Sequence, residues 1–475
     1  MTFNQQKNTQ TNEIVDIRIV NISLDNFENA YFLGIGGIGM SALARYFKSL
    51  GWNVAGYDKT PSPLTESLQQ EGIDVHYEDR NSSISSPYGD KTKTLVIVTP
   101  AVPKNLGELL YFQFNEFEIV KRSEVLGLIT KTSKGLGVAG THGKTTTSTM
   151  LAHLLDQSEV KCTAFLGGIS SNFNSNLVLN PSAAYTVIEA DEFDRSFLRL
   201  SPFASIITSA DPDHLDIYGD AAHFREGFEL YAGLHPENGV VVQKYGLNLP
   251  TAAKTITYGI NEPDSEYCGL NVRVENEKYL FDVQTPSGKW EAVELGIPGI
   301  HNAENAIACI ALCQFLGVDE ATIRSGLKTF LGVKRRFESI VKSQNLIYID
   351  DYAHHPTELK ALIDSIRLIY HDRKVTGVFQ PHLFTRTRDF FEGFVAQLSR
   401  LDEVILLPIY PAREEPIPGV TSDALLEKIT APDKKLMLPG EVVNYLSAHT
   451  EGVFLTIGAG DIDRIVNPLK KEWSE

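Results

Sequence analysis

A short glycine-rich segment carries residue types suited to holding a nucleoside triphosphate. It follows an apolar run, opens a helical pattern, and reads Gly140-Thr141-His142-Gly143-Lys144-Thr145-Thr146-Thr147. Such a turn directs backbone N–H groups at a phosphate, and the helix dipole favours the negative charge. Lys144 can reach the terminal phosphates, and the hydroxyl of Thr145 or Thr146 can bind Mg²⁺. The first glycine of the usual phosphate-loop pattern is replaced by Val138, but the remaining glycines, lysine and hydroxyls are in register, which disfavours a chance glycine-rich turn.

A second glycine-rich turn lies nearer the N-terminus, between a predicted strand at 30–33 and a predicted helix. It reads Gly34-Ile35-Gly36-Gly37-Ile38-Gly39, and Asp58 ends the next predicted strand, near the position of a ribose-binding acid. Alone, this pattern indicates a dinucleotide and hydride transfer, or simply a tightly packed strand–helix turn. Because another phosphate loop follows downstream, we favour a diphosphate-bearing substrate at the first loop and ATP at the second.

Acidic residues follow two predicted strands in the domain of the second loop. Glu189-Ala190-Asp191-Glu192-Phe193-Asp194 comes after a strand at 184–188, and Asp213-His214 comes after a strand at 204–208. Ligands gather at the carboxyl ends of parallel strands, and Mg²⁺ is commonly held by few carboxylates plus substrate phosphates. We therefore expect Glu189 and His214 near a Mg²⁺ site. The alternatives are a solvated acidic turn, which suits Asp194 better than Glu189, and a structural or exposed histidine.

The segment His301–Asn305 opens a predicted helix over 302–316. Asn302 and Asn305 are three residues apart and lie off its apolar stripe, so both can face one ligand. An amide offers a donor and an acceptor together, which suits an adenine edge. The sequence supports equally well the alternative that Asn302 is the N-cap of the helix.

Two further strand ends, in the last third of the chain, carry ionisable side chains. Asp350-Asp351-Tyr352-Ala353-His354-His355-Pro356 follows a predicted strand at 346–349, and Gln380–Arg388 follows one at 375–379. Together they form a candidate site facing the phosphates. Arg386 and Arg388 can grip a carboxylate through paired hydrogen bonds, or one of them can pair with a local acid.

Strand-like apolar runs alternate with helical periodicity along nearly the whole chain, which predicts α/β domains with mainly parallel sheets. The length of 475 residues suggests about three domains. We place them at 1–134, 135–332 and 333–475. The first is predicted to be Rossmann-like, the central one to be P-loop ATPase-like with a strand-rich section at 238–295, and the last to be a Rossmann-like α/β domain.

The composition disfavours several classes of protein. A net charge of −17 and a pI near 5.2 argue against general affinity for nucleic acid. The sequence has no signal-peptide pattern and no apolar run of about 18 residues, so neither secretion nor membrane insertion is expected. The four cysteines form no C-x-x-C pair and suit a reducing cytoplasm, and Cys309 and Cys313 are expected to pack in a helix. The polar residues 1–12 are expected to be disordered.

Taken in order, these blocks resemble the Mur ligase family over nearly the whole chain. The blocks that match are Gly34–Arg45, the phosphate loop, Glu189–Asp194, Asp213-His214, His301–Asn305, Asp351–Pro356 and Phe379–His382. Each block alone is weak, whereas the combination is specific. The resemblance implies that the first domain binds a UDP-linked substrate and that Asn176 contacts its muramyl part.

The resemblance also implies roles for individual residues. The UDP-substrate positions are Gly34, Gly36, Gly37, Ile38, Gly39, Asp58 and Asn176. The ATP positions are Gly140 through Thr146, Asn302 and Asn305 at the adenine, and Arg336 and Asp351. The metal positions are Thr145, Glu189 and His214. The amino-acid positions are Tyr352, His354, Arg386 and Arg388, and the catalytic positions are Lys144, His354, Arg386 and Arg388.

The activity implied is ATP- and Mg²⁺-dependent joining of L-alanine to the lactyl carboxylate of UDP-N-acetylmuramate through an acyl phosphate, in cytoplasmic peptidoglycan precursor synthesis. Phe228 stands where several later-acting members carry a carbamylated lysine, so no such lysine is assigned. Gly167–Phe173 is similar to the members that recycle a murein tripeptide, which leaves that amino substrate open. Alternatives from other classes are a nicotinamide-dependent oxidoreductase and a non-catalytic nucleotide sensor. The expected partners are small molecules only, and the expected state is a monomer or homodimer.

Overall fold

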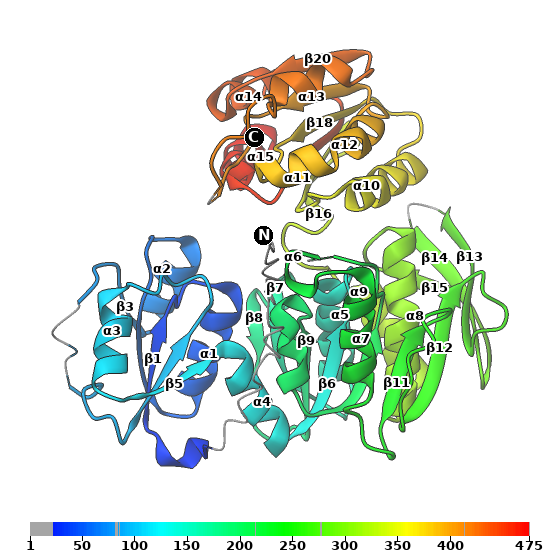
Figure 1. Ribbon diagram of the computed structural model, residues 1–475. Coiled ribbons are helices and arrows are strands. Elements are labelled where there is room, and N and C mark those ends of the chain that lie inside the picture. The colour runs from blue at the N-terminus through cyan, green and yellow to red at the C-terminus, as the bar shows by residue number, and fades with distance from the viewer. Residues whose placement is uncertain are drawn as a thin grey trace, which may run out of the picture. The chain divides into compact units, whose positions relative to one another are not determined.

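The computed structural model describes residues 22–80, 84, 86–213, 215–275, 278–412 and 414–474. The chain divides into two compact units: Met1–Thr132 with Arg199–Ser201, and Ser133–Leu198 with Pro202–Glu475. The second unit contains two separate sheets (Figure 1). The tail at 1–12 lies outside the described residues.

The described part of the first unit contains a parallel five-stranded sheet in the order β3-β2-β1-β4-β5. On one face of this sheet Phe32 meets Phe47, and on the other Tyr31 meets Phe112. Successive residues of one strand thus enter two apolar layers, which explains its unbroken apolar run. The strands are β1 (Asn29–Leu33), β2 (Asn53–Tyr57), β3 (Asp74–His76), β4 (Thr94–Val98) and β5 (Glu118–Lys121), and the helices are η1 (Leu24–Asn26), α1 (Ile38–Ser49), α2 (Pro63–Gln70), α3 (Gly107–Phe114) and α4 (Arg122–Thr132).

The first sheet of the second unit has ten strands among the described residues, ordered β15-β14-β13-β12-β11-β10-β6-β9-β7-β8. Strands from β7 to β13 in this order pair in parallel, while β8, β14 and β15 are antiparallel to their neighbours. The strands are β6 (Lys134–Ala139), β7 (Thr163–Ser170), β8 (Ser175–Val178), β9 (Tyr185–Ala190), β10 (Pro202–Ile207), β11 (Val240–Lys244), β12 (Lys254–Ile260), β13 (Tyr267–Glu275), β14 (Lys278–Thr285) and β15 (Gly288–Leu295). The helices are α5 (Lys144–Asp156), η2 (Phe193–Arg199), α6 (Leu215–Tyr218), α7 (Ala221–Ala232), α8 (Ile300–Phe315) and α9 (Glu320–Thr329).

The last sheet is ordered β16-β17-β21-β18-β19-β20, with β16 antiparallel and the other strands parallel. Helices cover both faces, as in Figure 1. The strands are β16 (Glu338–Lys342), β17 (Leu346–Asp351), β18 (Val375–Phe379), β19 (Glu403–Leu406), β20 (Asp433–Leu436) and β21 (Gly452–Ile457). The helices are α10 (Pro356–Ile369), α11 (Phe384–Asp389), α12 (Phe391–Leu398), α13 (Ser422–Lys428), α14 (Pro439–Leu446), η3 (Asp461–Ile465) and α15 (Val466–Ser474).

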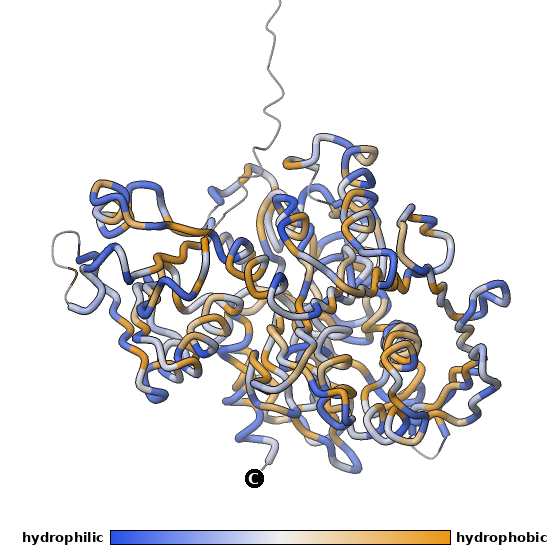
Figure 2. Tube along the Cα trace, turned by 90° about the horizontal axis from the view of Figure 1, so that it is seen from below, coloured by the Kyte–Doolittle hydropathy of each residue, from blue (hydrophilic) through white to orange (hydrophobic). Residues whose placement is uncertain are grey.

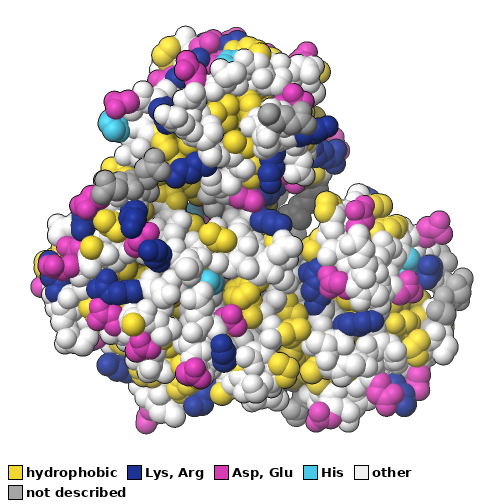
Figure 3. All heavy atoms as spheres, turned by 180° about the vertical axis from the view of Figure 1, so that it is seen from behind, with side chains coloured by type: hydrophobic (Ala, Val, Ile, Leu, Met, Phe, Trp, Pro, Cys, Tyr) yellow, Lys and Arg dark blue, Asp and Glu magenta, His cyan; other side chains and the backbone are white. Residues whose placement is uncertain are grey.

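The predicted fold class, three α/β sheets that are mainly parallel, is confirmed, and the strand-rich section at 238–295 forms β11 to β15. Apolar stretches of the trace lie within the layers, as Figure 2 shows by colour. Cys309 and Cys313 are buried in α8, as expected. Among the described helices, none combines the length and apolarity that crossing a membrane requires. On the face drawn in Figure 3, acidic and basic side chains are interspersed.

Candidate active site

The phosphate loop connects β6 to α5, and two of its glycines have backbone angles that other residues rarely adopt. Gly140 has φ +137° and Gly143, the N-cap of α5, has φ +82°. A Cβ on Gly140 would lie 2.0 Å from the Thr208 hydroxyl. Both positions therefore require glycine, and the loop directs its backbone toward the N-terminus of α5, where an anion is favoured.

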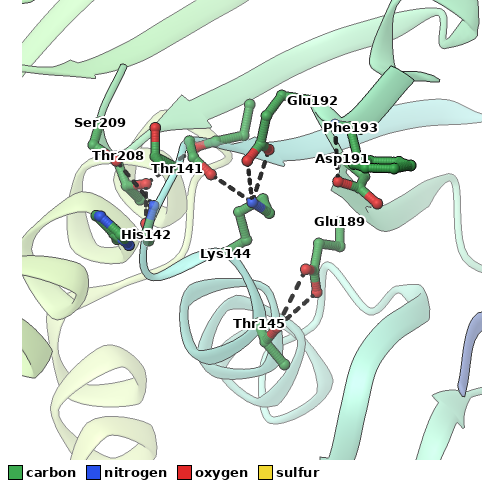
Figure 4. Close-up of polar contacts among 12 residues, drawn as sticks. Thr141, His142, Lys144, Thr145, Glu189, Asp191, Glu192, Phe193, Thr208 and Ser209 are labelled. Carbon is green, nitrogen blue, oxygen red and sulfur yellow. Dashed lines mark hydrogen bonds and ion pairs between the residues drawn. The ribbon is translucent and has the colours of Figure 1, made fainter. Parts of the chain in front are cut away.

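The loop is fastened to the segment that follows β10 (Figure 4). The His142 N–H donates to Ser209 Oγ at 3.0 Å, and the Thr141 hydroxyl donates to the Asp211 carbonyl at 2.7 Å. The Thr208 hydroxyl donates to the His142 carbonyl. These bonds hold the loop in shape without using the side chain of Lys144.

Lys144 is the first residue of α5, and its ammonium lies among carboxylates. Its Nζ donates to the two carboxylate oxygens of Glu192 at 2.8 and 2.7 Å and to the Gly140 carbonyl at 2.7 Å. Burial alone would lower the pKa of Lys144, but the nearby carboxylates, led by Glu192 and Glu189, raise it. The ammonium therefore stays charged.

Thr145 and Glu189 bring two oxygen donors together beside the loop (Figure 4). The Thr145 hydroxyl lies 3.0 Å from one carboxylate oxygen of Glu189, whose pKa is raised by burial. Within the described ranges, no group of three or more acidic, histidine or cysteine side chains is arranged to bind a metal ion. A hydroxyl and one carboxylate still fit Mg²⁺, which takes its other ligands from phosphates and water. His214, the third predicted ligand, lies outside the described residues.

The prediction that the strand before the acidic block ends at residue 188 is wrong by two residues. β9 continues to Ala190 because Val138 pairs with Glu189 and Ala139 with Ala190. Glu189 is therefore held by the sheet itself, and only the residues from Asp191 onward form a turn.

A cavity of about 290 Å³ opens beside the loop, between the ten-stranded sheet and the last sheet of the second unit. It brings together seven of the predicted ATP residues: His142, Gly143, Thr146, Asn302, Asn305, Arg336 and Asp351. His301 and Glu304 of the predicted block at 301–305 also line it, as do residues that the sequence did not single out, among them Lys244, Phe337 and Glu358. Phosphate-binding backbone, amide groups and an apolar wall thus share one space, as a nucleotide requires.

The two asparagines of α8 are inside the helix, so the alternative that Asn302 is an N-cap is wrong. The N-cap is Gly299, and α8 begins at Ile300, two residues before the predicted start. Asn302 donates to the Pro298 carbonyl at 2.6 Å, and the amide of Asn305 lies against Gly143 of the loop. Both side chains line the cavity, as expected if they face one ligand.

The cavity wall from the last sheet is charged. The Asp351 carboxylate accepts from the N–H groups of Phe337 and Ala353, both at 2.7 Å, and burial raises its pKa to about 6. Burial also opposes ionisation of Glu358, but His354 and Arg336 hold its pKa down to about 2. Arg336 lies 3.7 Å from Glu358, so a cation faces the cavity among these acids.

The predicted amino-acid residues form a row of rings with one arginine. Tyr352 meets His354 at 5.3 Å between ring centroids, and His354 meets His382 at 6.2 Å. The guanidinium of Arg386 lies 3.4 Å from Nδ1 of His382. Burial lowers the pKa of His354, which disfavours the protonated ring. Arg388 instead is half exposed and pairs with Asp389 at 2.7 Å, which matches the alternative that one arginine has a local partner.

The first glycine-rich loop lies in the other unit, between β1 and α1. Gly34 has φ +85°, and Gly37 is the N-cap of α1. The Gly36 N–H donates to the Asp58 carboxylate at 2.7 Å, so Asp58 braces the loop. A Cβ on Gly39 would lie 2.6 Å from the guanidinium of Arg122, a cation that the sequence analysis missed.

Asn176, the remaining predicted substrate contact, is buried in β8. It lies on the ten-stranded sheet and does not line the cavity. Its assignment to the muramyl part of the substrate stays a prediction.

Comparisons with known proteins agree with the sequence resemblance. Three family models match: "Mur ligase family, catalytic domain" over 29–134, "Mur ligase middle domain" over 138–313 and "Mur ligase, glutamate ligase domain" over 335–462. The fold and the phosphate site are those of a nucleotide-dependent ligase, and the chain belongs to the Mur ligase family.

Individual relatives indicate which members of the family this chain is most similar to among those compared. Curated UDP-N-acetylmuramate–L-alanine ligases are 49% identical in Porphyromonas gingivalis, over 94% of this chain and 98% of that protein, and 52% identical in Parabacteroides distasonis, over 93% and 96%. A crystal structure of a UDP-N-acetylmuramate–alanine ligase from Thermotoga maritima is 28% identical with a TM-score of 0.81, covering 94% of this chain and 99% of that one.

Proposed function

We propose that this protein is an ATP-dependent ligase that joins L-alanine to the lactyl carboxylate of UDP-N-acetylmuramate, a step of peptidoglycan precursor synthesis. The observation that carries the proposal is the cavity in which the loop before Lys144, the amides of α8 and the charged wall of the last sheet meet. The alanine ligases that share about half of this sequence support the choice of substrates. They also favour a ligase over a nicotinamide-dependent oxidoreductase or a nucleotide sensor.

The chemistry follows from the poor reactivity of a carboxylate toward an amine. Transfer of the γ-phosphoryl group of ATP to the lactyl carboxylate gives an acyl phosphate and ADP. The amine of alanine then attacks the acyl carbon, and phosphate leaves from the tetrahedral intermediate. Lys144 is the residue that would neutralise charge on the transferred group, a form of catalysis that depends on pre-positioned charge.

Thr145 and Glu189 would hold Mg²⁺, and His214 remains a predicted third ligand. A bound Mg²⁺ would neutralise the phosphate oxygens during transfer. Asn302 and Asn305 would contact adenine, and Arg336 and Asp351 the rest of the nucleotide.

We infer that the amino acid binds along the row of rings in the last sheet. Arg386 would pair with the carboxylate of alanine, with Arg388 as a second candidate. His354, whose protonated form burial disfavours, would accept a hydrogen bond or a proton from the amine. Water must be excluded from an acyl phosphate, so we expect the last sheet to close on the loop when the substrates bind.

In the first unit, the loop of Gly34, Gly36, Gly37, Ile38 and Gly39 would hold the UDP pyrophosphate, and Asp58 would brace that loop or bind the ribose. Because the reaction consumes ATP and a UDP-linked sugar, we place it in the cytoplasm. We expect a monomer or homodimer with small-molecule partners only.

The proposal is tested by phosphate release with ATP, Mg²⁺ and UDP-N-acetylmuramate, adding either L-alanine or the tripeptide L-Ala-γ-D-Glu-meso-diaminopimelate. We expect release with alanine and a product heavier by one alanyl residue in mass spectrometry. Release with the tripeptide alone would assign the chain to recycling. Release with neither would contradict the proposed activity.

A further inference from the structure

Glu192 is a buried carboxylate that the proposed reaction does not use. It comes two residues after the end of β9, and its side chain is 2% exposed. Both of its carboxylate oxygens accept from Lys144, and Figure 4 shows the two side chains pointing toward each other. Glu192 therefore contacts the residue, Lys144, that is proposed to bind the phosphates of ATP.

The turn after Glu192 holds this carboxylate inward. The Glu192 carbonyl accepts from the Tyr218 hydroxyl at 2.6 Å and from the Arg195 N–H at 2.9 Å. Asp194 and Arg195 have φ of +48° and +58°, and the guanidinium of Arg195 lies over the Tyr218 ring. Such backbone angles persist only where surrounding contacts over-determine them, so the turn is built to place Glu192.

The Glu192 pair competes with a phosphate for the same three hydrogens. A lysine ammonium has three donors, and here they go to the two oxygens of Glu192 and the Gly140 carbonyl. A phosphate that bonds to Lys144 must take at least one of them. Where that hydrogen is one that Glu192 accepts, the buried carboxylate loses part of its pairing with Lys144, which is costly. In either case the carboxylate repels the incoming negative charge.

We propose that Glu192 is a positioning residue that exchanges Lys144 with the nucleotide. It holds the ammonium against the Gly140 carbonyl before ATP binds and takes it back after phosphoryl transfer, which promotes the release of ADP and phosphate. The inference rests on the proposed function in one respect, that Lys144 contacts the phosphates of ATP.

The test is the dissociation constant of Mg·ADP, measured by titration calorimetry on the full chain and its variants. Glu192→Gln keeps the shape and removes the charge, so we expect Mg·ADP to bind about tenfold more tightly, ~1.4 kcal/mol, with a lower kcat. A purely structural role would weaken binding instead. Glu192→Asp keeps the charge but is too short for the paired contact, and we expect an affinity between those of the wild type and Glu192→Gln.

Asp194→Asn is the matched control, because it removes one charge from the same turn at a residue that does not contact Lys144. We expect its affinity for Mg·ADP to stay within about twofold of the wild type. Equal or weaker binding in Glu192→Gln overturns the inference, and if that variant does not fold, equal or weaker binding in Glu192→Asp does so. A wild-type chain that fails to bind Mg·ADP overturns the proposed function as well, which separates the two failures.

Discussion

Two glycine-rich turns in this chain are alike in where their glycines lie and differ in their side chains. In both, a glycine with positive φ directly follows the strand, Gly34 after β1 and Gly140 after β6, and a glycine is the N-cap of the next helix. The first helix then begins with Ile38-Gly39, whereas the second begins with Lys144-Thr145. The backbone can hold a phosphate in either turn, but only the second adds a lysine ammonium at the start of its helix and a hydroxyl for a metal. If the first turn binds the UDP-linked substrate as proposed, the chain separates the binding of a diphosphate from the transfer of a phosphoryl group.

The turns are also braced differently. Asp58 accepts from the Gly36 N–H in the first turn, while hydroxyls and carbonyls fasten the second, through Ser209 and Thr208. An acid that braces the first loop adds negative charge beside a site for an anion, while the guanidinium of Arg122 lies next to Gly39 of the same loop. In the second turn the acid Glu192 contacts the lysine rather than the loop backbone.

Removing the cation of the second turn should have the largest effect. We expect Lys144→Ala to lower kcat for phosphate release about 10²–10³-fold, the cost of removing one pre-positioned group that stabilises transition-state charge. Lys134→Ala, at the opposite end of β6 and exposed, is the matched control and should keep most activity. Activity of Lys144→Ala close to that of the wild type would remove the distinction between the two turns.

The second-largest effect should come from replacing Glu189, the carboxylate beside the second turn that is proposed to bind Mg²⁺. We expect Glu189→Gln to raise the Mg²⁺ concentration needed for half-maximal rate about tenfold and to lower kcat, because a neutral amide is a poorer ligand for Mg²⁺ than a carboxylate. The measurement is initial rate against Mg²⁺ at saturating ATP, with the exposed Glu237→Gln as control. An unchanged Mg²⁺ dependence would show that Glu189 is not a ligand.

The sequence predicted the turns well because each depends on local chemistry. Glycines at fixed offsets between a strand and a helix require no knowledge of distant residues, and β1 begins within one residue of the predicted strand at 30–33. The contacts of Glu192 and Arg122 could not be predicted in the same way. Each depends on which side chain the sheet topology brings beside the loop, across 48 residues in the pair of Lys144 with Glu192.

The predicted boundaries of some helices and strands were wrong for a related reason. The apolar run that indicated the end of β9 at residue 188 stops where the charge begins, but hydrogen bonding to β6 continues through Glu189. Asn302 has the side chain of an N-cap, yet the N-cap is Gly299, and the helix begins two residues before the predicted start. When a polar side chain within a helix or strand faces a cavity, the sequence pattern wrongly indicates that the helix or strand ends there.

Adding a side chain to the first turn should affect binding without affecting transfer. A Cβ on Gly36 would lie 2.6 Å from Thr65 Cγ2 and 2.8 Å from the Asp58 carboxylate, so the loop must shift. We expect Gly36→Ala to raise KM for UDP-N-acetylmuramate about tenfold while kcat at saturation stays near that of the wild type, the pattern of lost uniform binding. Gly440→Ala, where a Cβ meets open space, is the control. A drop in kcat with unchanged KM would contradict the division of labour between the turns.

The smallest effect should come from Asp58→Asn, and a comparison with Asp58→Ala can separate two roles of this acid. If Asp58 acts by accepting from the Gly36 N–H, Asp58→Asn retains an acceptor and should change KM for UDP-N-acetylmuramate less than about threefold, whereas Asp58→Ala should raise it about tenfold, the range for a hydrogen bond to a charged group. If Asp58 binds the ribose, as the spacing after the glycines predicts, a 2′-deoxy substrate should lose affinity with the wild type and lose none with Asp58→Ala. Equal losses of affinity for the 2′-deoxy substrate in the wild type and in Asp58→Ala would indicate that Asp58 acts only by accepting the hydrogen bond from Gly36. The first turn would then use its acid to shape backbone, and the second would use its acid to control a cation.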